Sequence, residues 1–205
     1  PYTTLFRSRP ASYCGVVGYK PSYGKISTGG VKSLSVSLDT LGAFGRTVSD
    51  VALGVAAMSA DHDLAKIDPL DHTIRIGICK TSDFAMAQQE TIAALSLAAF
   101  AAKPFAKGGV SEITLPHSCD KLSEIQTQIM LFEMAKSFTF EKLNHLDQIS
   151  TTLQTIIQRG DQIHYQQYSE ALTQAWRAGA DLCQAFEDQF DILIAPSATG
   201  EAPNT

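Results

Sequence analysis

Hydrophobic and polar positions alternate in two short stretches that flank a helix-like segment. Residues 74–78 (IRIGI) and 110–115 (VSEITL) place apolar side chains at every second position, which predicts strands. Between them, residues 90–103 are rich in alanine and leucine, a composition that favours a helix ended by Pro104. A strand, a helix and a second strand in this order predict a crossover unit, and therefore an α/β fold.

From Leu122 the spacing of apolar residues becomes helical. Residues 122–132, 153–157 and 172–190 carry apolar side chains three or four positions apart, and a strand is expected at 191–195, before Pro196. Aromatic and methionine side chains at this spacing line a substrate pocket less often than they fill a core, so a core role is expected for Met130, Phe132, Trp176 and Phe186. Residues 122–190 are nevertheless where we expect substrate selection to reside.

The amino-terminal third predicts short elements punctuated by glycine. Residues 16–20 predict a strand that ends at Pro21, and residues 38–44 predict a second short strand. Thr47 and Asp50 have the spacing of a capping box at the start of a helix. For Asp39 and Asp50 we therefore expect turn or cap roles rather than acid–base chemistry.

Composition and charge exclude several classes of function. The chain has 205 residues, with 16 basic and 21 acidic side chains and a net charge of -5, so we expect no nucleic-acid partner attracted by bulk charge. The longest uncharged apolar run, residues 91–102, is shorter than the roughly 20 residues that cross a bilayer, so no membrane partner is expected. The 4 cysteines are far apart, which favours reduced thiols and a cytoplasmic location. The 5 histidines form no metal motif, and no cofactor or metal is expected.

The most informative segments lie between residues 10 and 52. They read PASYCGVVGYKPSYG (10–24), SLDTLG (37–42) and RTVSDVA (46–52). In this order they resemble the amidase signature family of serine-dependent amide hydrolases, and residues 194–203 (IAPSATGEAP) resemble a late strand and loop of the same family. The resemblance implies a partial amidase-signature fold, a mixed β-sheet flanked by helices. It also implies hydrolysis of an amide bond in a small molecule by a serine, a bridging cis-serine and a lysine.

One departure from the family pattern affects the catalytic centre. The family motif Gly-Gly-Ser-x-x-Arg-Pro-Ala places its nucleophilic serine four residues before the proline, and that position is Phe6 here. Residues 1–8 match no part of the motif, and we interpret them as a non-native segment that resembles translated adapter sequence. The expected domain is then a partial amidase domain, residues 9–205, truncated at both ends. No catalytic residue is assigned within the chain, which we expect to be inactive on its own.

Arg9 is the one candidate substrate-binding residue. The resemblance places it three residues after the nucleophile position, and a guanidinium grips a carboxylate or carbonyl with parallel hydrogen bonds. A structural arginine paired with a nearby carboxylate is the alternative.

Gly15 and Gly18 lack the pattern of a phosphate loop. For Cys14 we expect a packed position in the core.

Three functions remain open on the sequence alone. The first is a small-molecule amidase, which the stretch at residues 194–203 favours. The second is the A subunit of a tRNA-dependent amidotransferase, and the third is a non-catalytic module of the same fold. The sequence also leaves open whether the chain forms a homodimer. Unpaired strand edges and an exposed apolar face predict poor solubility for such a fragment.

Overall fold

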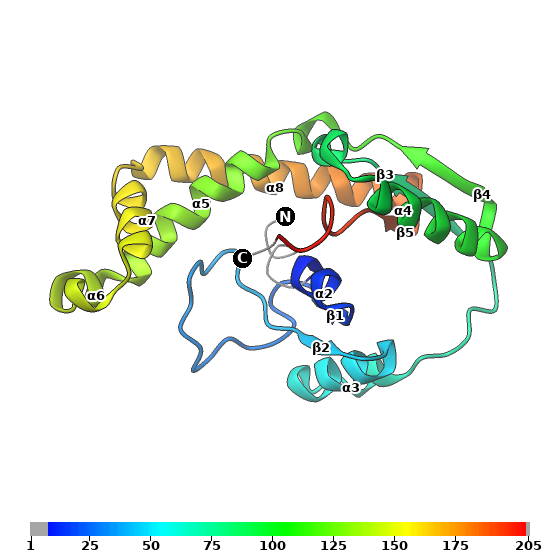
Figure 1. Cartoon of the computed structure of the whole chain (residues 1–205), viewed down its shortest axis with the longest axis horizontal. Coiled ribbons are helices and arrows are strands. Elements are labelled where there is room, and N and C mark those ends of the chain that lie inside the picture. The colour runs from blue at the N-terminus through cyan, green and yellow to red at the C-terminus, as the bar shows by residue number, and fades with distance from the viewer. Residues whose placement is uncertain (1–7, 204–205) are drawn as a thin grey trace.

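A three-stranded parallel sheet forms one end of the molecule. In the computed structural model, which describes residues 8–203, strand β3 (Ile74–Cys79) lies between β4 (Ala106–Ile113) and β5 (Ile192–Ile194). Both neighbours pair parallel to β3, and helix α4 (Gln89–Ala102) is the crossover that connects β3 to β4. The predicted crossover unit and the α/β class are therefore confirmed (Figure 1).

Strand β4 begins earlier than the alternating stretch at 110–115 predicts, and two glycines lie in the additional segment. Gly108 and Gly109 have φ angles of 77° and 95°, a conformation that glycine adopts without strain. The register of β4 against β3 shifts at this point, between Ile74 and Ile76. The strand therefore begins at Ala106, four residues before the alternating stretch.

A short antiparallel pair organises the amino-terminal third. Strand β1 (Val17–Tyr19) pairs with β2 (Ala43–Gly45), helix α2 (Ser8–Cys14) precedes the pair and α3 (Val48–Ser59) follows it. The capping box at the start of α3 is confirmed, since Thr47 Oγ1 accepts a hydrogen bond from the Asp50 amide and Asp50 Oδ2 accepts one from the Thr47 amide. The strand predicted over residues 38–44 is wrong for most of its length. Residues 33–39, here called the serine loop, instead form a turn around Asp39.

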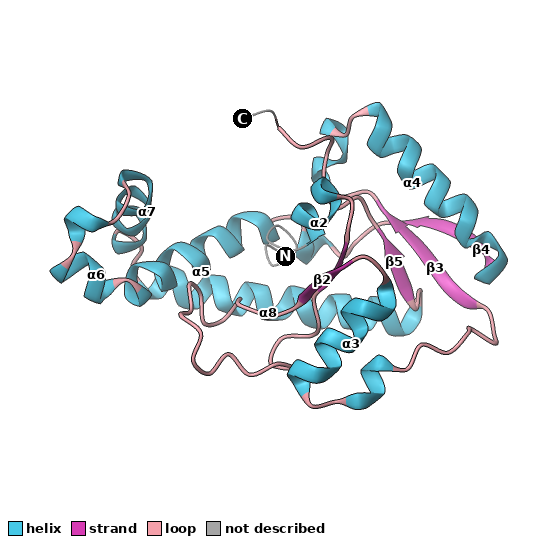
Figure 2. Ribbon diagram, turned by 60° about the horizontal axis from the view of Figure 1, so that its bottom comes forward, coloured by secondary structure: helices cyan, strands magenta, loops and turns pink. Residues whose placement is uncertain are grey.

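The carboxyl-terminal half is mostly helical. It contains α5 (Leu122–Ser137), α6 (Thr139–Asn144), α7 (Thr151–Asp161) and α8 (Tyr165–Asp188). Short 3₁₀ turns lie at His62–Ala65, Ser82–Met86, Lys103–Phe105, His117–Cys119 and Leu146–Gln148. Figure 2 shows α5 and α8 running side by side away from the sheet. No helix within residues 8–203 has the length and apolar character needed to cross a bilayer.

Buried side chains hold α5 and α8 together. Ile125, Ile129 and Ala171 form the centre of this contact, and Leu38 of the serine loop packs against it.

The aromatic residues expected in the core differ in their contacts and exposure. Phe132 stacks on Tyr168 with ring centroids 4.2 Å apart. Trp176, in contrast, is 81% exposed, because it lies on the side of α8 that faces away from this contact.

An ion pair ties the end of α8 to the sheet. Arg75 of β3 contacts Asp191, with Nη2 to Oδ1 at 2.7 Å, and its guanidinium also donates to the carbonyls of Phe186 and Glu187. Those carbonyls belong to the last turn of α8, where a cation is favourable. The side-chain hydrogen bond from Arg75 lowers the pKa of Asp191 to about 2.

Alanine at position 160 tests the contact between α5 and α7. A Cβ there would overlap the Leu131 carbonyl and would lie 2.8 Å from Ala135 Cβ, so we expect Gly160→Ala to lower the free energy of unfolding by about 2–3 kcal/mol. Gly179 in α8 is a matched control, since a Cβ there meets nothing within 4 Å, and Gly179→Ala should raise the free energy of unfolding by about 0.5–1 kcal/mol. Urea denaturation measures both, and equal effects of the two variants would contradict this packing.

Acid titration tests the pair of Arg75 and Asp191. Because the folded pKa of Asp191 is about 2 against an ordinary 3.8, its contribution to stability is complete above pH 3.8 and is lost as the pH falls from 3.8 toward 2. Asp191→Asn should flatten the fall in unfolding free energy over this window, measured by urea denaturation at each pH. Arg75→Leu should flatten it in the same way, and an unchanged slope in both variants would contradict the assignment.

Candidate functional site

Arg9 lines a small cavity at the carboxyl edge of the parallel sheet. The cavity has a volume of about 60 Å³, and its other walls are Thr81, Phe84 and Ala87 after β3 and residues 196–199 after β5. Open α/β sheets place their ligand sites outside the carboxyl ends of their strands. The first turn of α2 therefore brings the candidate substrate-binding residue to the edge where such a fold binds ligands.

A second, larger cavity shares a wall with the first. Its volume is about 230 Å³, and residues 196–198 line both. The wall on the α2 side includes Ser12, one turn after Arg9, and the wall on the α4 side includes Thr91 and Leu95. Together the two cavities run along the loop that follows β5, and the larger one lies between α2 and α4.

Gln88 fixes the loop that forms this shared wall. The Gln88 amide donates to the carbonyl of Thr199 at 2.7 Å, and the Glu201 amide donates to Gln88 Oε1 at 3.2 Å. A Cβ on Gly200 would overlap the far end of the Gln88 side chain, so a larger residue there would displace that side chain from its hydrogen bond with the Glu201 amide. The loop is thus held against the start of α4 at a defined distance from the sheet.

Arg9 has a buried polar atom without a partner. Its side chain is partly buried, and Nε makes no hydrogen bond. None of the ion pairs in the described part of the chain includes Arg9. An unmatched buried donor costs about 1–3 kcal/mol, so a guanidinium in this state favours an anionic or carbonyl partner.

The other sequence candidates have structural roles or exposed positions. Asp39 Oδ2 accepts hydrogen bonds from the side chain of Ser33 and from the backbone amides of Leu34 and Ser35, which confirms its turn role. Gly15, with φ at 64°, ends α2. The packed position expected for Cys14 is wrong, because this residue at the end of α2 is exposed. Among residues whose side chains are described, no group of three or more histidine, cysteine or acidic residues is arranged to hold a metal ion.

Glu133 has a buried carboxylate with several hydrogen-bond donors, a feature typical of functional residues, and the sequence pattern did not indicate it. Its carboxylate is buried in α5 and accepts hydrogen bonds from Ser35 Oγ at 2.6 Å, from Ser37 Oγ at 2.5 Å and from the Tyr168 hydroxyl at 2.6 Å. Burial raises the pKa of Glu133, but the hydrogen bonds from the serines and the tyrosine favour the ionised form more strongly. The pKa therefore lies below its ordinary value. A single glutamate in a helical pattern does not indicate which residues from distant parts of the chain will bind its carboxylate.

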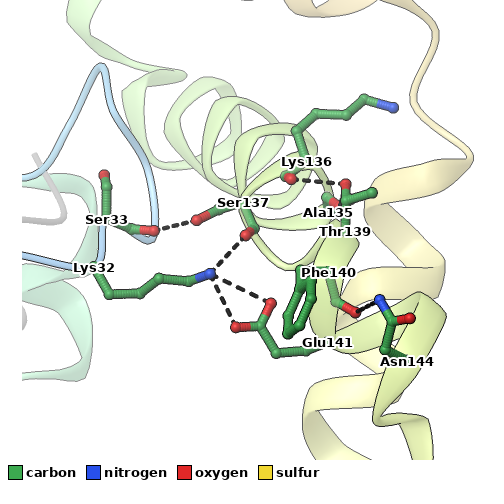
Figure 3. Close-up of polar contacts among 9 residues, drawn as sticks. All are labelled: Lys32, Ser33, Ala135, Lys136, Ser137, Thr139, Phe140, Glu141 and Asn144. Carbon is green, nitrogen blue, oxygen red and sulfur yellow. Dashed lines mark hydrogen bonds and ion pairs between the residues drawn. The ribbon is translucent and has the colours of Figure 1, made fainter.

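A second set of contacts holds Ser33 of the serine loop, and Lys32 just before it, to the end of α5. Figure 3 shows Lys32 beside the start of α6: its Nζ donates to the carbonyl of Ser137 at 2.9 Å and lies 3.0 Å from Glu141 Oε1. The Ser137 hydroxyl donates in turn to the carbonyl of Ser33. The ammonium of Lys32 lowers the pKa of Glu141 below its ordinary value. The serine loop is therefore anchored to α5 at two successive turns.

Comparison with known proteins identifies the fold. A solved amidase structure superposes with a TM-score of 0.82 at 24% identity, over 98% of this chain and 45% of that one. A 6-aminohexanoate cyclic dimer hydrolase complexed with its substrate gives a TM-score of 0.77 at 21% identity, over 98% and 46%. The chain thus spans less than half the length of these structures.

A curated relative matches over a shorter stretch. The A subunit of the glutamyl-tRNA(Gln) amidotransferase from Sulfurihydrogenibium sp. is 46% identical over 67 residues, which make up 33% of this chain and 13% of that protein. The family model described as amidase matches residues 8–205. The chain therefore belongs to the amidase signature family.

Proposed function

We propose that this chain supplies the substrate-binding edge of an enzyme that hydrolyses a carbon–nitrogen amide bond of a small molecule to a carboxylate and ammonia or an amine. The Arg9 cavity is the single observation that carries the proposal. It combines an unpaired guanidinium with a position at the carboxyl ends of β3 and β5. Family membership supplies the class of reaction.

The proposed chemistry is acyl transfer to a serine. The serine oxygen adds to the amide carbonyl, the carbon–nitrogen bond breaks, and the leaving nitrogen takes a proton. Water then releases the carboxylate and restores the serine. An amide nitrogen is a poor leaving group, so this route requires an activated nucleophile and a proton donor. In the family these are a serine, a bridging cis-serine and a lysine.

This chain contributes binding rather than the nucleophile. The family pattern places the nucleophile at Phe6, which lies outside the described residues, and phenylalanine has no group that attacks a carbonyl. We therefore propose that the chain on its own binds amides without turning them over. Arg9 would orient a carboxylate or carbonyl of the substrate through parallel hydrogen bonds.

The A subunit of a tRNA-dependent amidotransferase is the second candidate. It is favoured by the local identity to a curated protein of that kind, which covers a third of the chain. The amidase and cyclic dimer hydrolase structures match almost the whole chain. We therefore place the small-molecule amidase first.

Ligand affinity tests the role of Arg9. We expect the chain to bind succinamate, an amide that carries a carboxylate, and Arg9→Ala to weaken that binding about tenfold, since a hydrogen bond to a charged group contributes about 1.5–3 kcal/mol. Binding of butanamide, which has no carboxylate, should fall less. Arg46→Ala is the matched control, because Arg46 is exposed and lies outside both cavities. Equal losses in the two variants, measured by ligand-observed NMR titration, would contradict the role of Arg9.

Product release tests the statement about the nucleophile. The purified chain, incubated with the same two amides, should release no ammonia above a buffer blank. Turnover that disappears on mutation of a side chain within residues 8–203 would show that the chain holds its own nucleophile.

A further inference from the structure

The larger cavity at the carboxyl edge of the sheet, here called the α2–α4 cavity, differs in character from the cavity at Arg9. None of the described residues that line it carries a charge, and most of them are alanine or larger aliphatic residues. Its volume is about 230 Å³, against about 60 Å³ for the Arg9 cavity. A ligand that fills both therefore needs a small polar group at Arg9 and a larger apolar group beside it.

The two cavities lie next to each other along α2. Arg9 lines the smaller one, Ser12 lines the larger one, and residues 196–198 of the loop after β5 line both. Three residues of an α-helix rise by about 4.5 Å, which sets the offset between the two cavities along α2. An apolar group attached close to the group held by Arg9 therefore reaches the α2–α4 cavity.

One face of α4 leaves this space open. Four residues of the helix line the cavity with the i, i+3, i+4, i+7 pattern of a single face, namely Thr91, Ala94, Leu95 and Ala98. The side chains of the two alanines end at Cβ, so they leave the space in front of this face unfilled. A leucine at position 94 or 98 would occupy part of it.

Apolar surface that enters the α2–α4 cavity favours binding. The volume of about 230 Å³ is several times the roughly 30 Å³ that one water molecule takes up in the liquid, so the cavity admits a group of several non-hydrogen atoms. Each methylene group removed from water strengthens binding by up to about fourfold. A charged group in the same place would lose hydration without gaining a partner of opposite charge.

We propose that the α2–α4 cavity is a specificity subsite that holds a short aliphatic group of the substrate, attached close to the carboxylate or carbonyl that Arg9 orients. This inference rests on the proposed amide-binding function and narrows its substrate class to amides that carry such a group. The Arg9 cavity then fixes the polar end of the substrate, and the α2–α4 cavity selects its apolar branch.

The experiment compares succinamate with 2-propylsuccinamate, which has a propyl group on the carbon beside the carboxylate. Ligand-observed NMR titration of the wild-type chain should give at least tenfold tighter binding of 2-propylsuccinamate. Arg9→Ala should weaken both ligands by the same factor and keep the preference, because both carry the carboxylate.

Two neighbouring alanines of α4 provide a matched pair of variants. Ala93 and Ala94 are both exposed, but Ala94 lines the cavity and Ala93 is not among the described residues that do. Ala94→Leu should remove the preference for 2-propylsuccinamate and leave succinamate binding unchanged, whereas Ala93→Leu should change neither affinity. Ala98→Leu, on the same face as Ala94, is a second variant that should act as Ala94→Leu does.

The other outcomes separate failure of the subsite from failure of the proposed function. If the wild-type chain binds succinamate through Arg9 but shows no preference for 2-propylsuccinamate, the subsite is wrong and the proposed function stands. The subsite is also wrong if Ala94→Leu and Ala98→Leu keep the preference, or if Ala93→Leu removes it equally. If the wild-type chain binds neither ligand, the proposed function fails and this inference fails with it.

Discussion

The parallel pairing of β3 with β5 is the constraint on which the site depends. These strands are far apart in the chain, and their pairing brings the segment after β3 against the loop after β5 at one edge of the sheet. Gly77 allows the close approach, since a Cβ there would lie 2.8 Å from Leu193 Cδ2. The contact between Arg75 and Asp191 holds the same two strands at their opposite ends. Once this edge is formed, α2 supplies Arg9 to the cavity.

A second constraint fixes the serine loop. Residues 33–39 form no helix or strand. Their position is set by hydrogen bonds to the Glu133 carboxylate and to Ser137 at the end of α5. The Glu133 carboxylate is buried, and its hydrogen bonds hold its pKa below the ordinary value, so loss of those donors would leave a buried charge without partners. The loop is thereby fixed to α5 and α8, so the strand β2 that follows it starts from a defined point.

The spacing of apolar and capping residues predicted those elements that depend on residues close together in the chain. The alternation at 74–78, the helix between the two strands and the capping box of Thr47 and Asp50 were all visible in the sequence, because each depends on residues close together in the chain. Cys14 and Trp176 were misplaced, since an apolar type at a suitable spacing does not say whether a neighbouring element covers it. Glu133 was not found, because its hydrogen-bond donors belong to segments far away in the sequence. Arg9 was selected from a motif, and the structure adds the cavity that it lines.

The side-chain NMR resonance of Arg9 Nε–H reports whether this guanidinium binds the ligand. This atom is buried and unpaired in the structure, next to the cavity at the carboxyl edge of the sheet. In a titration of ¹⁵N-labelled chain with succinamate, we expect a saturable shift of the Arg9 resonance, while the resonance of the exposed Arg46 stays unchanged. An Arg9 resonance that stays in place while the ligand binds elsewhere would contradict the proposed role of Arg9.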